Sequence, residues 1–210
     1  MIKIPHVETL LFIRAVEKLS LAIIFLTGII ALSGCATVVP EIPESLQQRA
    51  LDGDVNAQFE IGFKYYEARY NFWSTSPANW KNAASWFEMA ANQNDPRAQY
   101  YLSVYYFNEL QDYVRSFELT KLSAEQGVAE AQYSLGMHYA QAWGTEQNLI
   151  LAYKWIALSN DAGIQGGSLA DVEWLIWKAN MNTIQIAEGR RLFEEHLANH
   201  GRSQLLKSIR

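Results

Sequence analysis

Apolar residues recur at helical spacing in a part of the chain that spans residues 131–163. Ala131, Leu135 and Tyr139 lie four residues apart, so they share one face of a helix. A second apolar run with helical spacing follows. Gly144, between the two runs, favours a turn because glycine readily adopts the positive φ that ends a helix. The pattern predicts two short helices that fold back on each other.

The same two-helix pattern occurs twice more upstream, and its positions can be matched column by column. The columns are, for the first helix, Ala57, Ala98 and Ala131; Ile61, Leu102 and Leu135; Gly62, Ser103 and Gly136; and Tyr65, Tyr106 and Tyr139; and, for the second helix, Ala83, Ser116 and Ala152; Trp86, Leu119 and Trp155; and Ala90, Ser123 and Ser159. The first-helix alanines are offset by 41 and then 33 residues, and the tryptophan column by 33 and then 36. Self-similarity at about 30–45 residues indicates a helical solenoid.

Turn and capping residues predict where the helices begin and end. Asp95-Pro96 should begin a helix, since Asp caps a helix and Pro suits its first turn. Residues 46–51 are expected to form a capping half-repeat, and a last helix within 181–193 to seal the other end. Helices are expected at about 55–68, 80–93, 96–108, 112–126, 128–141, 148–162 and 169–178. The predicted fold is all-α: an α/α solenoid of about three helix-pair repeats with capping helices at both ends.

The columns also predict the core of each helix pair. Trp86 and Trp155 should be buried between paired helices, opposite small residues. Gly62 and Gly136 should allow those helices to approach closely. The second repeat departs from this arrangement, with Ser103 in the glycine column and leucine in the tryptophan column.

These residues resemble the pattern of the Sel-one-like repeat family, which is related to the tetratricopeptide repeats. In that family the first helix carries Ala, then Leu-Gly, then Tyr, and the second carries Ala, Trp and Ala-Ala with a following Gly. The third repeat of this chain matches well, and the first matches apart from a long insertion. The resemblance covers about Leu46 to Phe193. It implies a helical solenoid and an adaptor function, because the family contains many adaptors and few enzymes.

The N-terminal segment predicts that the protein is exported. Charged residues occur before residue 19, and Leu19 to Leu32 is an uncharged apolar run that leads into Leu-Ser-Gly-Cys at Cys35. A charged start, a short apolar core and small residues before a cleavage point are typical of a signal peptide. The last four residues resemble a bacterial lipobox, whose cysteine becomes a diacylated N-terminus. The alternative is an uncleaved membrane anchor, but a spanning helix needs about 20 apolar residues.

The predicted organisation is a signal peptide over 1–34, a lipidated N-terminus and tether over 35–43, a repeat domain over 44–199 and a polar tail over 200–210. The expected localisation is the bacterial cell envelope. Ala36 follows Cys35, in place of the Asp that resembles an inner-membrane retention signal, so we expect the outer membrane, facing the periplasm. Cys35 is the only cysteine, which excludes an intrachain disulfide and a thiolate metal cluster.

An aromatic insertion supplies the candidate partner site. Tyr65 and Ala83 are 18 residues apart, whereas the corresponding gaps in the other repeats are 10 and 13. Insertions in repeats map to loops on one face, so residues 66–82 form either a local mini-core or a recognition surface. The predicted partner-binding residues are Lys64, Tyr66, Tyr70, Trp73, Trp80, Tyr105 and His138.

Other candidate chemistry is weaker. The net charge of −5 has the wrong sign for a nucleic-acid binder. His196 and His200 have the spacing of two metal ligands on a helix, but a third ligand is not evident. No cofactor, metal or nucleic acid is therefore expected. The predicted function is a membrane-anchored adaptor for a protein or peptide; the alternative is an enzyme that acts on a cell-envelope polymer through acidic groove residues.

Overall fold

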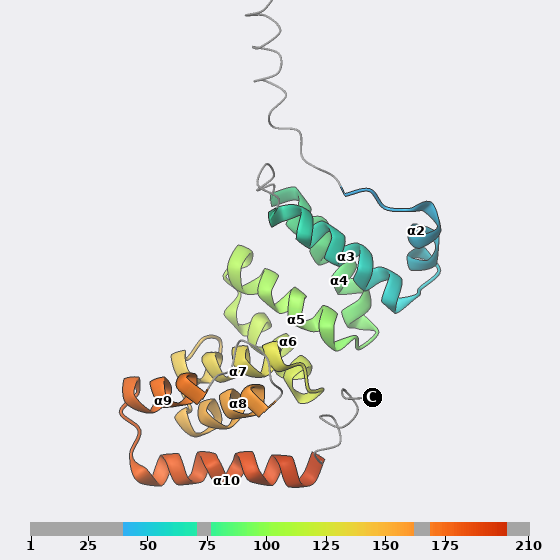
Figure 1. Cartoon of the computed structure of the whole chain (residues 1–210). Coiled ribbons are helices and arrows are strands. Elements are labelled where there is room, and N and C mark those ends of the chain that lie inside the picture. Colours follow the sequence, from blue (N-terminus) through green and yellow to red (C-terminus); the bar gives the residue numbers. More distant parts are fainter. Residues whose placement is uncertain (1–39, 71–76, 162–168, 201–210) are drawn as a thin grey trace, which may run out of the picture.

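The computed structural model describes residues 40–70, 77–161 and 169–200, and every element in these ranges is a helix (Figure 1). In chain order the elements are α2 (Glu44–Leu51), α3 (Val55–Tyr70), α4 (Pro77–Asn92), α5 (Pro96–Tyr105), the π-helix η2 (Tyr106–Leu110), α6 (Tyr113–Glu125), α7 (Ala129–Gln141), α8 (Leu149–Asp161), α9 (Leu169–Lys178) and α10 (Thr183–His200). The predicted all-α class is confirmed. The predicted signal peptide, Cys35, most of the predicted tether, Trp73 and the predicted tail beyond residue 200 lie outside the described residues.

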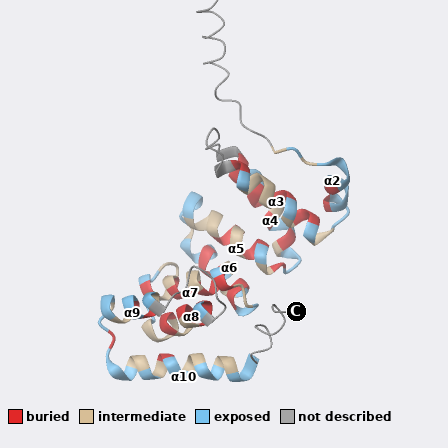
Figure 2. Cartoon of the chain, viewed as in Figure 1, coloured by how far each residue is buried: buried red, intermediate tan, exposed pale blue. Residues whose placement is uncertain are grey.

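Consecutive helices form three antiparallel pairs that stack along the chain. The pairs are α3 with α4, α5 with α6, and α7 with α8; α4 then contacts α5, and α6 contacts α7 (Figure 1). Buried residues lie within each pair and between neighbouring pairs, and the opposite faces are exposed (Figure 2). At one end Leu46 and Ala50 of α2 pack on Ala57 and Ile61. At the other end α10 lies against α8, so the array is a solenoid closed by helices at both ends.

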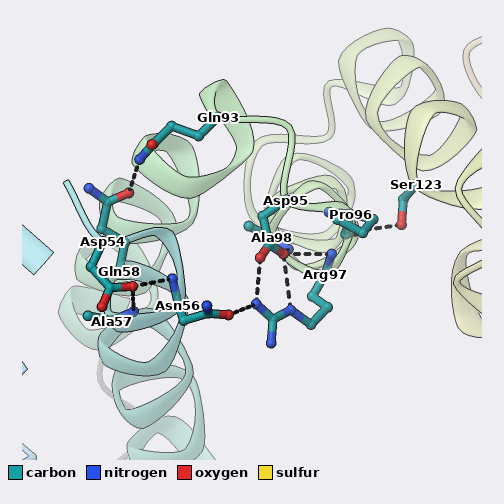
Figure 3. Close-up of polar contacts among 10 residues, drawn as sticks. All are labelled: Asp54, Asn56, Ala57, Gln58, Gln93, Asp95, Pro96, Arg97, Ala98 and Ser123. Atoms are coloured by element: carbon teal, nitrogen blue, oxygen red, sulfur yellow. Dashed lines mark hydrogen bonds and ion pairs between the residues drawn. The ribbon is translucent and has the colours of Figure 1, made fainter.

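Each joint between repeats uses the same local structure. At each joint, a residue with positive φ follows the preceding helix: Gly53 at 95°, Asn94 at 66° and Gly127 at 90°. At the first two joints, Asp54 and Asp95 then accept hydrogen bonds from the first backbone N–H groups of the next helix (Figure 3). These carboxylates satisfy donors that have no partner within the helix. The joints predicted from sequence are therefore confirmed at these positions.

A buried glutamine fixes the alignment of the two helices in the first and second pairs. Gln58 and Gln99 occupy equivalent positions beside the alanine column, and each is about 3% exposed. Gln93 donates to Oε1 of Gln58 at 2.8 Å, and Gln126 donates to Oε1 of Gln99 at the same distance (Figure 3 shows the first pair). Because an unpaired buried amide is costly, these pairs favour one alignment of the two helices within a repeat over shifted ones.

Glycine brings the helices together in the first and third pairs. A Cβ on Gly62 would lie 2.7 Å from the Phe87 ring, and a Cβ on Gly136 would lie 2.5 Å from Cγ1 of Ile156. Both distances are too short for real contacts, so the predicted role of these glycines is confirmed. Phe87 and Ile156 are both fully buried and fill the space beside the glycine.

The prediction for the tryptophan column is half right. Trp155 is buried, packed in the cluster that includes Leu135 and Leu158. Trp86 is only half-buried, so the prediction that it is a core residue is wrong. Its neighbour in the stack is the eight-residue cap α2, which is too short to cover an indole ring completely.

Candidate functional site

The second helix pair lacks the large residue that fills the other two. Thr120 occupies the position held by Phe87 in the first repeat and Ile156 in the third, and Ser103 stands where the others have glycine. Threonine is shorter than either residue, so part of this space remains empty. The result is a pocket of about 340 Å³ between α5, α6 and α7, with Ser103, Ser116 and Thr120 among its lining residues.

A neutral histidine and two hydroxyl groups lie at the buried end of this pocket. His138 is 3% exposed, and its Nδ1 lies 2.7 Å from the backbone carbonyl of Trp143. A carbonyl can only accept, so Nδ1 carries the proton and Nε2 is an acceptor in the neutral ring. Ser116 Oγ, 3.3 Å from Nε2, therefore donates its proton to the histidine.

Burial keeps the histidine uncharged. It lowers the pKa of His138, because the imidazolium form would lose its hydration, and this effect outweighs the hydrogen bond to Trp143, which favours the charged form. Thr120 Oγ1 is the other polar atom at this end. The side chain is 1% exposed, and within the described structure its hydroxyl has no hydrogen-bond partner. A buried unsatisfied hydroxyl costs about 1–3 kcal/mol, so an occupant of the pocket that bonded to it would recover this cost.

Aromatic and thioether groups form the walls. Phe107 meets the His138 ring at 5.7 Å and the Trp143 ring at 4.9 Å, both edge to face. Tyr133 and Met137 of α7 complete the lining on the facing helix. Edge-to-face aromatic pairs are favourable, so these rings hold one another in place.

Unusual backbone positions the rings. Phe107 lies in the π-helix η2, which ends at Gln111 in the left-handed region with φ 53°. π-Helical turns widen a helix locally and often occur at functional sites. The loop with Trp143 follows Ala142, at φ 58°, and is held by Gly144, at φ 70°. A Cβ on Gly144 would collide with the backbone carbonyl of Tyr113, so the loop packs closely on the start of α6.

The structure brings only one predicted partner residue to this pocket. His138 lines it, whereas Lys64, Tyr66 and Tyr105 do not. Tyr66 and Tyr105 instead contact Trp80, at ring distances of 5.0 and 5.5 Å. Trp80 is 0% exposed, so the prediction that it lies at an exposed groove edge is wrong. Helix α4 begins at Pro77, before the expected start, and this places Trp80 in the core as the mini-core alternative predicts. Trp73 lies outside the described residues, as does the side chain of Tyr70, and their role stays a prediction.

Sequence reasoning did not identify the residues that make the pocket. Phe107, Ser116, Thr120 and Trp143 were not candidates for binding. The available signal was the second repeat's departure from the glycine column at Ser103, which is accompanied by a departure at Thr120. Where small residues face each other across a helix pair, the space between the helices is not filled. Comparing these positions among the three repeats locates the pocket.

The carboxylates and the histidines of α10 lie elsewhere. Glu88 and Glu118 line a separate hollow of about 530 Å³ between α4, α5 and α6, together with Arg115. His196 and His200 of α10 stack at 4.1 Å between ring centres. Across residues 40–70, 77–161 and 169–200, no three His, Cys, Asp or Glu side chains converge on a point that could hold a metal ion. Over the same ranges, none of the helices combines the length and apolar character needed to cross a bilayer.

Comparisons with known proteins agree with this architecture. A solved structure with a TM-score of 0.63 and 22% identity is that of c5321, a protective antigen present in uropathogenic Escherichia coli strains and displaying an SLR fold; the match covers 73% of this chain and 32% of that one. The chain thus spans about a third of the length of that relative. A Sel1 repeat protein from Oxalobacter formigenes matches with a TM-score of 0.50 and 28% identity, over 64% of this chain and 96% of that one.

The sequence comparison assigns the repeats one by one. No curated protein matches the chain significantly. The Sel1 repeat matches three consecutive segments, residues 55–95, 96–128 and 129–164, which together make up more than half of the chain. Their bounds coincide with the three helix pairs. Proteins built of Sel1 repeats typically mediate protein–protein interactions. The chain belongs to the Sel1 repeat family.

Proposed function

We propose that this chain is a protein-binding adaptor, held at a bacterial membrane by lipid on Cys35, which takes a segment of its partner into the pocket of the second repeat. The pocket is the observation that carries this proposal. The first and third repeats fill the equivalent space with Phe87 and Ile156, whereas the second leaves it empty. Family membership supports the general class, since Sel1 repeats typically mediate protein–protein interactions.

The composition of the pocket suits a protein partner. Interface hot spots are enriched in aromatic residues, and Phe107, Tyr133 and Trp143 line this pocket. Met137 adds a flexible apolar side chain that adapts to the shape of an occupant. No carboxylate is among the lining residues, so an enzyme with acidic catalysts gains no support from this site.

Lipidation at Cys35 would keep the pocket near the membrane. Eight residues, 36–43, separate Cys35 from Glu44, the first residue of α2, so the chain takes nine steps between them. An extended chain spans at most about 3.3–3.6 Å per residue, which limits the distance from the lipid to α2 to about 30 Å. Two acyl chains give stable anchoring, whereas one gives marginal binding. The proposed partner is therefore a protein at the same membrane or close to it.

Site-specific photo-cross-linking in bacteria that express the full chain tests this function. A benzophenone amino acid at Asn108, an exposed residue that lines the pocket, should cross-link to a partner of discrete mass. The same amino acid at the exposed Glu173 of α9 should not. Filling the pocket should abolish the product. The matched change is Ser103→Gly with Thr120→Ile, which installs the residue pair that the third repeat already uses.

The comparison of the two positions decides the outcome. A product at Asn108 that disappears on filling supports an adaptor that uses this pocket. Equal products at Asn108 and Glu173, or a product that survives the filled variant, would contradict the proposal.

A further inference from the structure

We infer that the pocket of the second repeat recognises an uncharged phenol, the side-chain chemistry of tyrosine. This inference rests on the proposed function, because it names the group that a partner would insert. The same chemistry also occurs in free small phenols, and the experiment below separates the two sources.

The size of the pocket limits the occupant. Its volume of about 340 Å³ lies at the lower end of ligand pockets, which run from about 300 to 1,000 Å³. It suits one side chain or a small ring, whereas a folded element would not fit. The aromatic walls of Phe107 and Trp143 favour a ring over an aliphatic chain, because ring edges and faces attract one another. Met137 adds a sulfur that contacts aromatic rings favourably.

The charge of the occupant follows from the lining. The residues that line the pocket include no Asp, Glu, Lys or Arg, and the remaining titratable groups are Tyr133 and His138. Both are neutral near pH 7, since burial raises the pKa of Tyr133 and lowers that of His138. A charged group placed here would lose its hydration and gain no counter-ion. The occupant is therefore uncharged.

The hydrogen bonds distinguish a phenol from the other aromatic side chains. Ser116 gives its proton to His138, so the remaining lone pairs of its oxygen can only accept. Thr120 has no partner for its hydroxyl and can donate. Ser103 is already occupied, because its hydroxyl donates to the carbonyl of Tyr100 at 2.7 Å. The pocket thus offers one acceptor and one donor.

Both groups lie within reach of a single atom. Ser116 and Thr120 are four residues apart on α6, a spacing that places side chains about 5–6 Å apart on one helix face. A phenolic hydroxyl donates one proton and accepts another, and so it satisfies both serine and threonine at once. An indole only donates, and a phenyl ring does neither. Tyrosine is therefore the aromatic side chain that matches the pocket.

Calorimetric titration of the full chain in mild detergent tests the inference with three probes. The probes are p-cresol, which is the tyrosine side chain; toluene, which lacks the hydroxyl; and N-acetyltyrosinamide, which adds the peptide backbone. We expect p-cresol to bind at least tenfold more tightly than toluene. Thr120→Val keeps the shape and removes the donor, so it should reduce p-cresol affinity about tenfold and leave toluene unchanged. The filled variant, Ser103→Gly with Thr120→Ile, should bind neither and corrects for partition of the probes into detergent.

Each result decides something. N-acetyltyrosinamide binding within about threefold of p-cresol identifies a tyrosine side chain of a partner as the source; its exclusion, with p-cresol still bound, identifies a free small phenol. Toluene binding as tightly as p-cresol, unchanged p-cresol affinity in Thr120→Val, or no difference between the wild type and the filled variant overturns the inference. Overturning it while the Asn108 cross-link persists leaves the adaptor function standing. Loss of the cross-link with p-cresol binding intact overturns the adaptor function alone.

Discussion

Removing the hydroxyl of Thr120 should make the protein more stable. The side chain is 1% exposed and its oxygen has no hydrogen-bond partner in the described structure. Valine has nearly the same shape, carries no polar group and has a similar helix propensity. The substitution Thr120→Val therefore removes a desolvation cost and leaves the packing of α6 in place.

The magnitude follows from the price of an unsatisfied buried hydroxyl, about 1–3 kcal/mol. We expect a gain of about 1 kcal/mol, the lower end of this range. For a protein of 150–250 residues, 1 kcal/mol raises the Tm by about 2–4 °C. Urea unfolding of the full chain in detergent, followed by circular dichroism, gives the free-energy change directly.

Ser123→Ala is the matched control, because this hydroxyl is also buried on α6 but has a partner. Ser123 is 0% exposed and donates to the carbonyl of Pro96 in the preceding helix at 2.7 Å. Its removal should lower the unfolding free energy by about 0.5–1 kcal/mol, the usual net value of one hydrogen bond. The two deletions should therefore have opposite signs. A decrease for Thr120→Val of the same size as for Ser123→Ala would refute the reasoning, since it would mean that the Thr120 hydroxyl is fully satisfied.

Three further predictions follow from other parts of the chain. Cys35→Ser should abolish labelling by a palmitate analogue and leave the uncleaved form on a gel; normal size and membrane retention would contradict lipidation. Gly136→Ala should destabilise the protein by about 1–3 kcal/mol, because the new Cβ would lie 2.5 Å from Ile156, and a Tm equal to wild type would contradict the close approach of α7 and α8. Burial and the nearby Lys154 lower the pKa of His196 to about 4, below the ordinary value of 6.5, so the unfolded chain takes up a proton first as the pH falls. Stability contributed by the neutral ring is then complete above pH 6.5 and declines between 6.5 and about 4; His196→Gln should flatten the Tm-versus-pH curve in that window, and an unchanged slope would refute this.

The fold was predictable because small and large residues alternate in columns with a repeating physical role. Glycine at 62 and 136 requires a bulky neighbour across the pair, and that requirement appears in the sequence as a period. Capping by Asp95 and the positive φ at Gly127 are local features, so they too can be inferred from a few adjacent residues.

The pocket was harder to predict because it depends on large side chains being absent from three helices at once. Thr120 is unremarkable within its own helix and becomes informative only beside Phe87 and Ile156. The burial of Trp80 also depends on the insertion, since residues before Pro77 set where α4 begins. The aromatic residues of the insertion are compatible with either a mini-core or a recognition surface. The residue at which α4 begins decides between the two.

The paired glutamines have a consequence for how this array can be rebuilt. Gln58 with Gln93 and Gln99 with Gln126 make the same contact within successive repeats. Gln132, the equivalent residue of the third repeat, donates across the joint to the carbonyl of Ala124 at the end of the middle repeat, and a second copy of Gln99 can make the same bond there. In an Ising-like array, stability depends on each unit and its nearest neighbours. Residues 96–128 therefore behave as a cassette that can be duplicated in tandem. A protein with two pockets one repeat apart would bind its partner at two sites. Its avidity would rise with the effective concentration of the second site, without any new contact.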